Sequence, residues 1–121
     1  MPSPSNKEIE SAILSIRIDL PGGRFGPGKA ALLSAINDTG SIAAAARTLG
    51  MSYRKAWGLI EGLNAMFAAP VVATETGGAA KGGARLTEAG RRALGAYRSA
   101  VAAAELAAAS ELSVLRQLVD G

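Results

Sequence analysis

The sequence contains neither cysteine nor histidine. Without them the chain has no disulfide bond, no zinc site built from thiolate or imidazole ligands, no thiol nucleophile and no imidazole for acid–base catalysis. Carboxylate and lysine chemistry remain open in principle, but no paired-carboxylate motif stands out along the chain. We therefore predict a protein that is not an enzyme, with no catalytic residue and no metal site.

Long apolar runs are missing as well. No uncharged apolar stretch reaches the length of about 18 residues that a membrane-spanning helix needs. Residues 1–6 are polar and proline-rich, with no apolar segment behind them, which does not fit a secretory signal peptide. We expect a cytoplasmic, nucleoid-associated protein that has no membrane partner.

Aromatic residues are scarce. They make up 4% of the 121 residues, whereas hydrophobic residues make up 49%, so alanine supplies much of the apolar content. Alanine favours helices and lets them approach one another closely. The length suits one domain. These features predict a single, mainly α domain over residues 1–121.

Acidic residues are few in the middle of the chain. Residues 24–100 hold 10 Lys/Arg and 4 Asp/Glu, whereas residues 1–23 hold 2 against 3 and residues 101–121 hold 1 against 3. A basic middle suits a polyanion such as DNA. An ordinary solvated surface would also fit this balance, so charge alone does not decide.

Periodicity and breaker residues predict the order of the elements. Ser41 and Ser52 are good N-caps, and Gly40, Gly50 and Pro70 end helices. We predict, in this order, a flexible arm (1–11), a strand (12–20), a loop (21–28), three helices (29–38, 42–49 and 53–69), a hairpin (71–86) and a long helix (87–119). This order is the plan of a winged helix-turn-helix with a long C-terminal helix.

Residues 41–69 have the spacing of the helix-turn-helix itself. The first helix needs a small residue where the second crosses it, which is Ala46, and the turn needs a glycine, which is Gly50. The two helices also need apolar flanking residues, here Leu49, Met51, Ala56 and Leu59. A generic pair of antiparallel helices is the alternative, and a wing after the second helix favours the helix-turn-helix.

A helical projection of the third helix separates a buried face from an outward face. Centred on Ala56, the buried face collects Leu59, Ile60, Leu63 and Phe67, and the outward face collects Arg54, Gly58, Glu61, Gly62 and Ala65. A recognition helix contacts bases mainly with its N-terminal residues, so we expect Ser52, Arg54 and Lys55 to bind base edges or phosphates. Gly58 and Gly62 either allow close approach of DNA or another helix, or are simply tolerated.

Two aromatic residues flank these cations. Tyr53 and Trp57 project to the border between the buried and outward faces. We expect Trp57 to act mainly as a packing residue that fixes the helix, and Tyr53 to add a phosphate hydrogen bond through its hydroxyl.

The segment after the third helix is predicted as a wing. Residues 71–76 and 85–86 supply two strands, and the glycine-rich turn at 77–84 carries Lys81, with Arg85 at its base. A mobile basic tip can reach a phosphate or the minor groove. A glycine-rich hairpin with no role in DNA binding is the alternative.

The last helix carries one apolar stripe and is expected to break near Ser110. Its residues recur at near-heptad steps. The predicted dimer interface consists of Leu94, Tyr97, Val101, Ala104, Ala108, Leu112, Leu115 and Val119. The stripe extends beyond what a small winged domain needs for its own core, which favours a homodimer. The alternative is that it folds back on its own domain.

A nucleotide-binding motif must also be considered. Residues 23–29 match G-x-x-x-x-G-K between a strand and a helix. The position that binds magnesium through a hydroxyl is Ala30, and Pro27 removes one N–H from the phosphate cradle. No parallel sheet can be built from the remaining chain, so we predict no nucleotide partner.

Together these residues resemble a known family. The segments GSIAAAARTLGMSYRKAW and TETGGAAKGGARLTEAGRRAL are similar to the N-terminal DNA-binding domain of ModE-type molybdate-responsive transcriptional regulators, a winged helix related to the LysR-type domain. The matching features are Gly-Ser-Ile at 40–42, Ser-Tyr-x-x-Ala-Trp at 52–57, the Gly/Lys wing and Leu-Thr-x-x-Gly at 86–90. The likeness runs from about Leu14 to Tyr97.

The resemblance implies a homodimer on a palindromic promoter site in double-stranded DNA, with the recognition helix in the major groove and the wing beside it. Carried over by position, the contact residues are Ser52, Tyr53, Arg54, Lys55, Lys81 and Arg85, and Ser41 in the matching Gly-Ser-Ile completes the predicted set. Full-length members also carry C-terminal molybdate-binding domains, whereas this sequence ends at Gly121. We therefore expect no cofactor here, with molybdate and a link to metal-oxyanion homeostasis implied by resemblance alone.

Two other functions remain open. The chain could be a protein-interaction module that uses the long apolar helix and no DNA. It could also be a small oxyanion-binding regulator, with molybdate or tungstate held at helix N-termini or in a dimer cleft.

Overall fold

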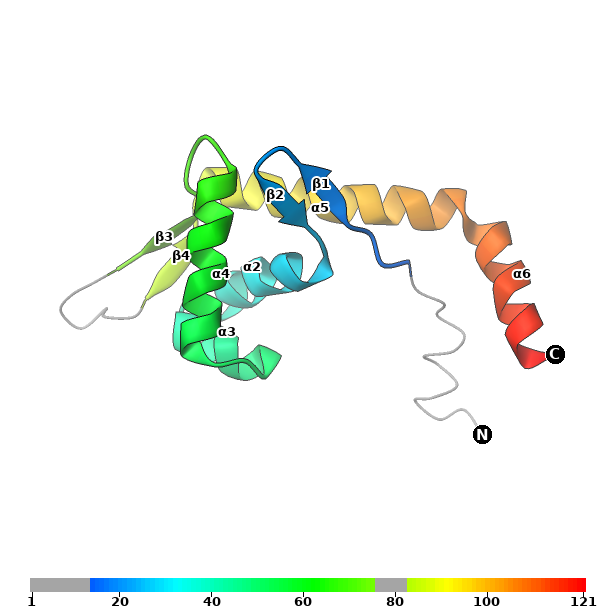
Figure 1. The fold of residues 1–121 in the computed structure, drawn as a ribbon, viewed down its shortest axis with the longest axis horizontal. Helices are drawn as coiled ribbons and strands as arrows, with labels where there is room; N and C mark the ends of the chain where they lie inside the picture. The colour runs from blue at the N-terminus through cyan, green and yellow to red at the C-terminus, as the bar shows by residue number, and fades with distance from the viewer. Residues whose placement is uncertain (1–13, 76–82) are drawn as a thin grey trace. The chain divides into compact units, whose positions relative to one another are not determined.

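The computed structural model describes residues 14–75 and 83–121, so the arm at 1–11 and the wing tip with Lys81 lie outside the described residues. The chain divides into two compact units, one formed by residues 16–97 and the other by residues 98–121 with the segment that ends at Ser15. The elements are β1 (Ile18–Leu20), β2 (Gly23–Phe25), α2 (Pro27–Thr39), α3 (Ile42–Leu49), α4 (Tyr53–Met66), β3 (Val72–Thr74), β4 (Ala84–Leu86), α5 (Glu88–Ala107) and α6 (Ala109–Asp120) (Figure 1). The mainly α class with a small hairpin after three helices confirms the predicted winged helix-turn-helix.

The first hairpin differs from the sequence prediction. β1 and β2 pair in antiparallel fashion, with Ile18 opposite Phe25. In the described part of the predicted strand at 12–20, which begins at Leu14, ladder pairing starts at Ile18, and the predicted loop at 21–28 contains a strand. The reason is tertiary: Phe25 is 3% exposed and stacks on Tyr97 with ring centroids 5.2 Å apart. A side chain buried this way holds a short strand that local sequence alone would not form.

Caps define the helix boundaries of the helix-turn-helix. The Ser41 hydroxyl accepts a hydrogen bond from the Ala44 amide at 3.1 Å at the start of α3. Gly40 and Gly50 follow α2 and α3 with left-handed φ values of 71° and 68°, a backbone conformation that glycine adopts without steric cost. The predicted caps and the predicted glycine in the turn are thus confirmed.

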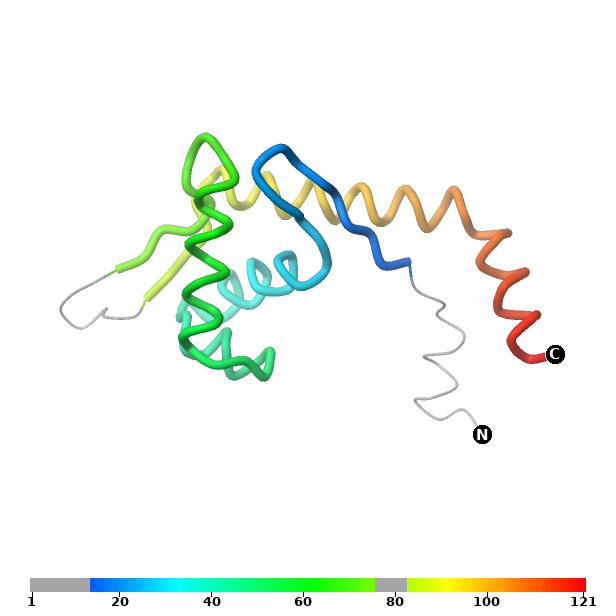
Figure 2. Tube along the Cα trace, in the orientation of Figure 1, coloured from blue at the N-terminus to red at the C-terminus, as the bar shows by residue number. Residues whose placement is uncertain are grey.

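Two helix ends differ by a few residues from the prediction. α2 begins at Pro27, where proline costs nothing because a first-turn N–H has no partner inside the helix. α4 ends at Met66, before the predicted Ala69, because Phe67 takes an extended conformation (φ −116°, ψ 158°). In Figure 2 the chain turns back sharply after α4 before it enters β3.

The core of the 16–97 unit is built around α2, which contacts α3, α4, β2 and β4. Its most completely buried large side chains are Leu32, Leu33, Ile36, Ile42, Ile60, Leu63 and Val71. On α4, Ala56, Ile60 and Leu63 are buried as predicted, whereas Leu59 and Phe67 are half-buried. Ala46 is 2% exposed, in keeping with its predicted place at the helix crossing.

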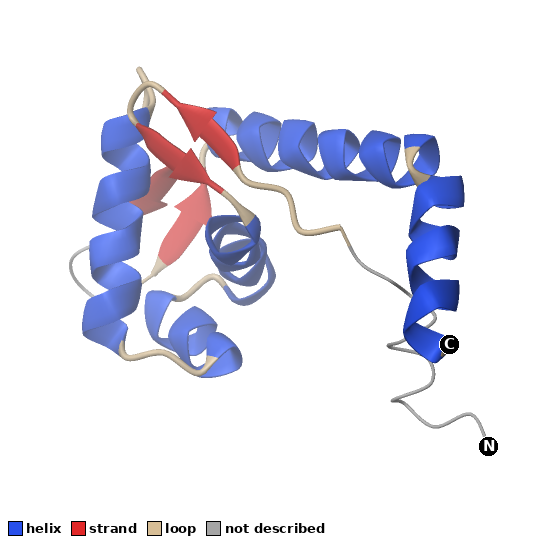
Figure 3. Ribbon diagram, turned by 45° about the vertical axis from the view of Figure 1, so that its right-hand side comes forward, coloured by secondary structure: helices blue, strands red, loops and turns tan. Residues whose placement is uncertain are grey.

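The predicted wing is present at its base. β3 and β4 pair in antiparallel fashion, with Val72 opposite Leu86, and Figure 3 shows them in red as a hairpin distinct from β1–β2. The outer side of β4 is bonded to the residues before α3, since the Ala84 amide donates to the Gly40 carbonyl oxygen at 3.0 Å and Gly83 bridges to Ser41. The helix-turn-helix and the wing therefore share one hydrogen-bonded framework.

The start of α5 is hydrogen-bonded to the segment that precedes β3. The Thr87 amide donates to the Val71 carbonyl at 3.0 Å, and the Thr87 hydroxyl donates to the Pro70 carbonyl at 2.7 Å. Gly90, one turn later, is buried directly against the Val71 carbonyl. This close contact gives the Leu-Thr-x-x-Gly segment a physical role.

The predicted long helix is two helices, with the break at Ala108 (φ −98°, ψ 12°), close to the predicted Ser110. Two members of the predicted dimer stripe belong to the core of the 16–97 unit, because Leu94 and Tyr97 are 4% and 8% exposed. Tyr97 also donates a hydrogen bond from its hydroxyl to the Ile16 carbonyl at 2.7 Å. The predicted stripe is therefore corrected to its outer six positions.

Those six positions lie in the other unit. Val101, Ala104, Ala108 and Leu112 are half-buried, whereas Leu115 and Val119 are exposed. α6 has no buried residue and also exposes Val114 and Leu118.

Candidate nucleic-acid interface

The N-terminus of α4 presents a cluster of exposed polar and basic residues. Ser52 caps the helix by accepting a hydrogen bond from the Lys55 amide at 3.0 Å. The next three side chains, Tyr53, Arg54 and Lys55, are all exposed, Tyr53 by 50%. Among the described residues none of these three has a side-chain hydrogen bond or ion pair. They are therefore held by a capped helix and remain available to a ligand.

The outward face of α4 is confirmed as an accessible surface. Arg54, Gly58, Glu61, Gly62 and Ala65 are all exposed. Among the described residues, a Cβ built on Gly58 or on Gly62 would meet no neighbouring atom within 4 Å. This face is cationic at its start and, apart from Glu61, carries only small residues further along.

Ser41 has a different setting from the α4 residues. It is half-buried, its hydroxyl caps α3, and its amide donates to the Thr39 hydroxyl at 3.3 Å. Its hydroxyl oxygen accepts one hydrogen bond within the protein, as that of Ser52 does, and its O–H group can still donate to a phosphate. The structure brings Ser41 next to the base of the wing through its bridge to Gly83.

On the wing, Arg85 is exposed in the middle of β4, between the buried Ala84 and Leu86. Alternation along the strand therefore turns Arg85 away from the core. It has no hydrogen-bond or ion-pair partner among the described residues. Lys81, the other predicted wing residue, lies outside them.

Several other cations are tied to their own chain. The Lys29 ammonium donates to the Arg24 carbonyl at 2.6 Å, so the lysine of the P-loop-like sequence bonds within its own loop. Arg91 donates to the Leu86 carbonyl at 3.1 Å, and Arg17 pairs with Asp19 at 3.0 Å. Arg54, Lys55 and Arg85 have no such tie among the described residues, and Arg24, Arg47 and Arg92 share this property.

Sequence reasoning missed two residues of this region. Arg47 is exposed in the last turn of α3, directly before the turn into α4, and its basic side chain at that position was a usable signal. Asn64, near the end of α4, makes three hydrogen bonds to the strand that begins the wing. No local pattern points to Asn64, because its partners follow only after the chain has turned back.

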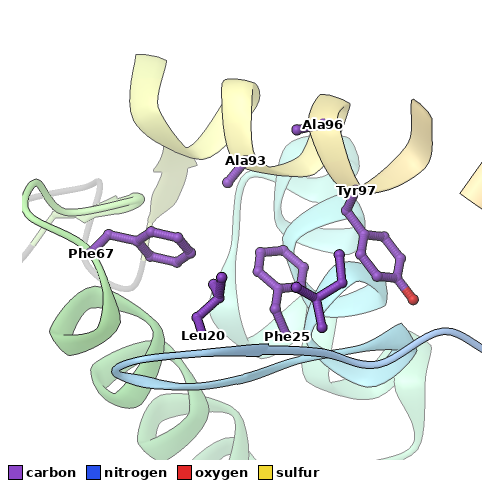
Figure 4. Close-up of a pocket in the computed structure, with 7 residues that line it drawn as sticks. Leu20, Phe25, Phe67, Ala93, Ala96 and Tyr97 are labelled. Carbon is purple, nitrogen blue, oxygen red and sulfur yellow. The ribbon is translucent and has the colours of Figure 1, made fainter. Parts of the chain in front are cut away.

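A separate apolar hollow of about 180 Å³ lies between the β1–β2 hairpin and α5 (Figure 4). It is lined by Ile18, Leu20, Phe25, Phe67, Ala93, Ala96 and Tyr97. These side chains carry no cation, and the one polar group, the Tyr97 hydroxyl, is bonded to Ile16. Such a lining does not suit an oxyanion, whose burial needs charged or hydrogen-bonding partners.

Within residues 14–75 and 83–121, no group of three or more Asp or Glu side chains is placed to hold a metal ion. In the same ranges no helix combines the length and the apolarity needed to cross a membrane.

Residues 29–91 match the family described as bacterial regulatory helix-turn-helix protein, lysR family. These residues take in α2 from Lys29 onward, α3, α4, the wing and the first turn of α5.

Several curated proteins are similar to this chain, and the predicted resemblance to ModE-type regulators is confirmed. The molybdenum-pterin-binding protein MopB of Rhodobacter capsulatus is 49% identical over 80 residues, which are 66% of this chain and 30% of MopB. The transcriptional regulator ModE of Yersinia pestis is 41% identical over 71 residues, 59% of this chain and 27% of that protein. The molybdenum transport protein ModE of Azotobacter vinelandii is 41% identical over 68 residues, 56% of this chain and 25% of that protein. The chain thus spans less than a third of the length of these relatives.

Proposed function

Because the chain belongs to the lysR family of bacterial regulatory helix-turn-helix proteins, we propose that it is a DNA-binding transcriptional regulator with α4 as its recognition helix. The observation that carries this proposal is the exposed, unpartnered pair Arg54 and Lys55 at the capped start of α4. A helix in the major groove reads bases with its N-terminal residues. Arginine and lysine at that end suit guanine edges and phosphates.

The wing supplies the second contact in this proposal. Arg85, exposed on β4, and Lys81, at the tip predicted from the sequence, bind the adjacent backbone or minor groove. Phosphate contacts of this kind fix the position of the protein on the duplex and make binding salt-dependent. Base readout is assigned to Arg54 and Lys55, with Ser52 and Tyr53 at the edge of the contact.

The proposal includes a homodimer on a palindromic site. Four large apolar side chains of α6 are 52–79% exposed: Val114, Leu115, Leu118 and Val119. A patch of this kind marks an association surface, and a two-fold dimer matches a palindromic operator. In sedimentation velocity, the pair Leu115→Glu and Leu118→Glu should shift the protein to monomer, and Gln117→Glu with Ser113→Glu should not. A dimer that survives the first pair would contradict the interface.

The regulated genes in this proposal serve molybdenum homeostasis. The support is that MopB and ModE are named for molybdenum-pterin binding and molybdenum transport. Genome-wide footprinting of the bound protein tests the idea. Sites next to genes for molybdenum uptake or use are expected, and sites without any such relation would refute the link.

DNA binding itself is tested by titrating footprinted sites across a salt series. Arg54→Ala should cost about 1–3 kcal/mol and relax the base preference, whereas Arg85→Ala or Lys81→Ala should lower the salt slope by about 1. Arg17→Ala is the charge-matched control, since Arg17 is ion-paired with Asp19 on the first hairpin. An effect of Arg54→Ala no larger than that of Arg17→Ala would reject the assigned interface. Tight binding of a protein partner without DNA, unchanged by joint Arg54→Ala and Lys81→Ala, would favour an interaction module instead.

A further inference from the structure

Asn64 joins the proposed recognition helix to the wing. Its side-chain oxygen accepts hydrogen bonds from the Val71 amide at 2.8 Å and the Val72 amide at 3.0 Å. Its side-chain nitrogen donates to the Val72 carbonyl oxygen at 3.1 Å. One amide group therefore binds both the donor and the acceptor of the same strand residue, as a neighbouring β-strand would.

The geometry of the hairpin explains why Val72 needs such a partner. Next to Val72, the Val71 carbonyl oxygen accepts a hydrogen bond from the Thr87 amide. Further along the chain, the Glu75 amide donates to the Gly83 carbonyl oxygen. In an antiparallel pair, residues bonded to the partner strand alternate with residues whose N–H and C=O groups point to the opposite side, and Val72, next to Val71, is of the second kind. Val72 is 2% exposed, so water cannot satisfy these groups, and leaving them unbonded would be costly.

The other strand of the hairpin is held in a similar way. The Ala84 amide, on β4, donates to the Gly40 carbonyl just before α3. The β3–β4 hairpin is thus bonded on one side to α4 through Asn64 and on the other to the start of α3. These two attachments join the wing to the helix-turn-helix by hydrogen bonds, beside the packing of β4 on α2, and of the two only Asn64 uses a side chain.

We propose that Asn64 is the positioning residue that sets the wing relative to α4, so that both reach the same DNA duplex. The effect on DNA binding rests on the proposed function, whereas the hydrogen bonds of Asn64 exist without DNA. Asparagine is suited to this role because its side-chain amide carries a hydrogen-bond acceptor and a hydrogen-bond donor at the same distance from the backbone. Aspartate would keep the two amide bonds but place a carboxylate oxygen against the Val72 carbonyl, and leucine would lose all three bonds.

The competing explanation is that Asn64 only satisfies buried backbone groups and stabilises the fold. A loss of stability or of total DNA affinity would follow from either explanation. The test therefore needs readouts of relative position and of individual DNA contacts.

The first readout is a distance measurement without DNA. The chain has no cysteine, so Glu61→Cys on α4 and Glu75→Cys after β3, both at exposed positions, provide two unique spin-label sites. We expect one narrow distance distribution with Asn64 present and a broadened or shifted one with Asn64→Leu or Asn64→Asp. Circular dichroism selects a temperature at which every variant is folded. If Asn64→Leu does not fold, Asn64→Asp carries the test. Identical distributions in all folded variants would overturn the proposal.

The second readout is a double-mutant cycle on DNA affinity. In the parent chain, Arg85→Ala should weaken binding about tenfold, the effect of one lost charge-assisted contact. In the Asn64→Leu or Asn64→Asp background we expect this loss to fall below about twofold, because a displaced wing no longer makes the contact. The loss caused by Arg54→Ala should keep its size, since α4 itself is unchanged.

The outcomes separate the two proposals. Unchanged losses for both arginines in the Asn64 variants, or equal shrinkage of both, would assign Asn64 a purely structural role. If the parent chain binds no DNA, the proposed function fails, and the spin-label distances alone then decide whether Asn64 positions the wing.

Discussion

Gly90 offers the sharpest test of how the wing is held against α5. Gly90 lies in the first turn of α5 with a φ value outside the positive region, so its backbone does not require glycine. What requires glycine is space. A Cβ at this position would fall far inside van der Waals distance of the Val71 carbonyl oxygen and 3.0 Å from its carbonyl carbon. Both are backbone atoms and cannot rotate away.

The expected effect of Gly90→Ala follows from what would have to move. Retreat of α5 would break the bonds from Thr87 to the Val71 and Pro70 carbonyls. These bonds contribute roughly 1 kcal/mol each. Overpacking adds about 1–3 kcal/mol, and the better helix propensity of alanine offsets about 1 kcal/mol. The free energy of unfolding should therefore fall by about 2–4 kcal/mol, a large part of the roughly 5–15 kcal/mol typical of a domain.

Thermal unfolding followed by circular dichroism measures this effect. For a domain of this size the predicted loss lowers Tm by roughly 10–30 °C. Gly95→Ala is the matched control, because Gly95 is on the same helix, is exposed, and would place its Cβ in open space. That variant should gain about 1 kcal/mol from helix propensity alone. The steric reasoning is refuted if Gly90→Ala melts at or above the parent temperature, as Gly95→Ala is expected to do.

Five further substitutions, at four positions, test the site and its support. Ser52→Ala should remove about 1 kcal/mol of stability by deleting the cap of α4. Ser52→Asp should keep the cap but weaken DNA binding. Equal DNA affinity for the Ser52→Asp variant and the parent would place Ser52 away from the phosphates. Tyr97→Phe should cost about 1 kcal/mol in urea denaturation through the lost bond to Ile16, and no change would mean that the ring stack on Phe25 alone holds the first hairpin. Gly58→Ala and Gly62→Ala should each raise stability by about 1 kcal/mol, and a lower Tm would contradict the open space on α4. If the stabilised glycine variants also lose DNA affinity, the DNA backbone approaches this face of the helix.

Much of the fold could be predicted because its signals are local. Ser41 and Ser52 accept hydrogen bonds from amides three residues ahead, and Gly40 and Gly50 adopt left-handed backbone where a helix must end. The exposed face of α4 also follows from helical periodicity. For this reason the amino-acid sequence alone was enough to predict that Arg54 and Lys55 are exposed at the start of α4.

The errors have a common cause in contacts between distant parts of the chain. Residues 21–28 contain the local signals of a loop, yet Gly23–Phe25 is a strand because Phe25 is buried against Tyr97. Tyr97 fits the apolar stripe of the last helix, yet its hydroxyl bonds to Ile16, 81 positions away. A stripe on a helix shows that a surface will be covered, but it does not show by which part of the protein.

By itself the sequence determined the helix starts and stops, the order of elements and the cationic start of α4, since each depends on residues within a few positions of one another. Only the tertiary structure decided that Asn64 bonds the backbone of Val72, that a Cβ has no room at Gly90 but has room at Gly95, and that Leu94 and Tyr97 belong to the core. These roles depend on which backbone groups and surfaces meet after the chain has folded. The physical reason is that hydrogen-bond satisfaction and excluded volume belong to pairs of atoms, and the partners of these residues are brought to them only by the fold.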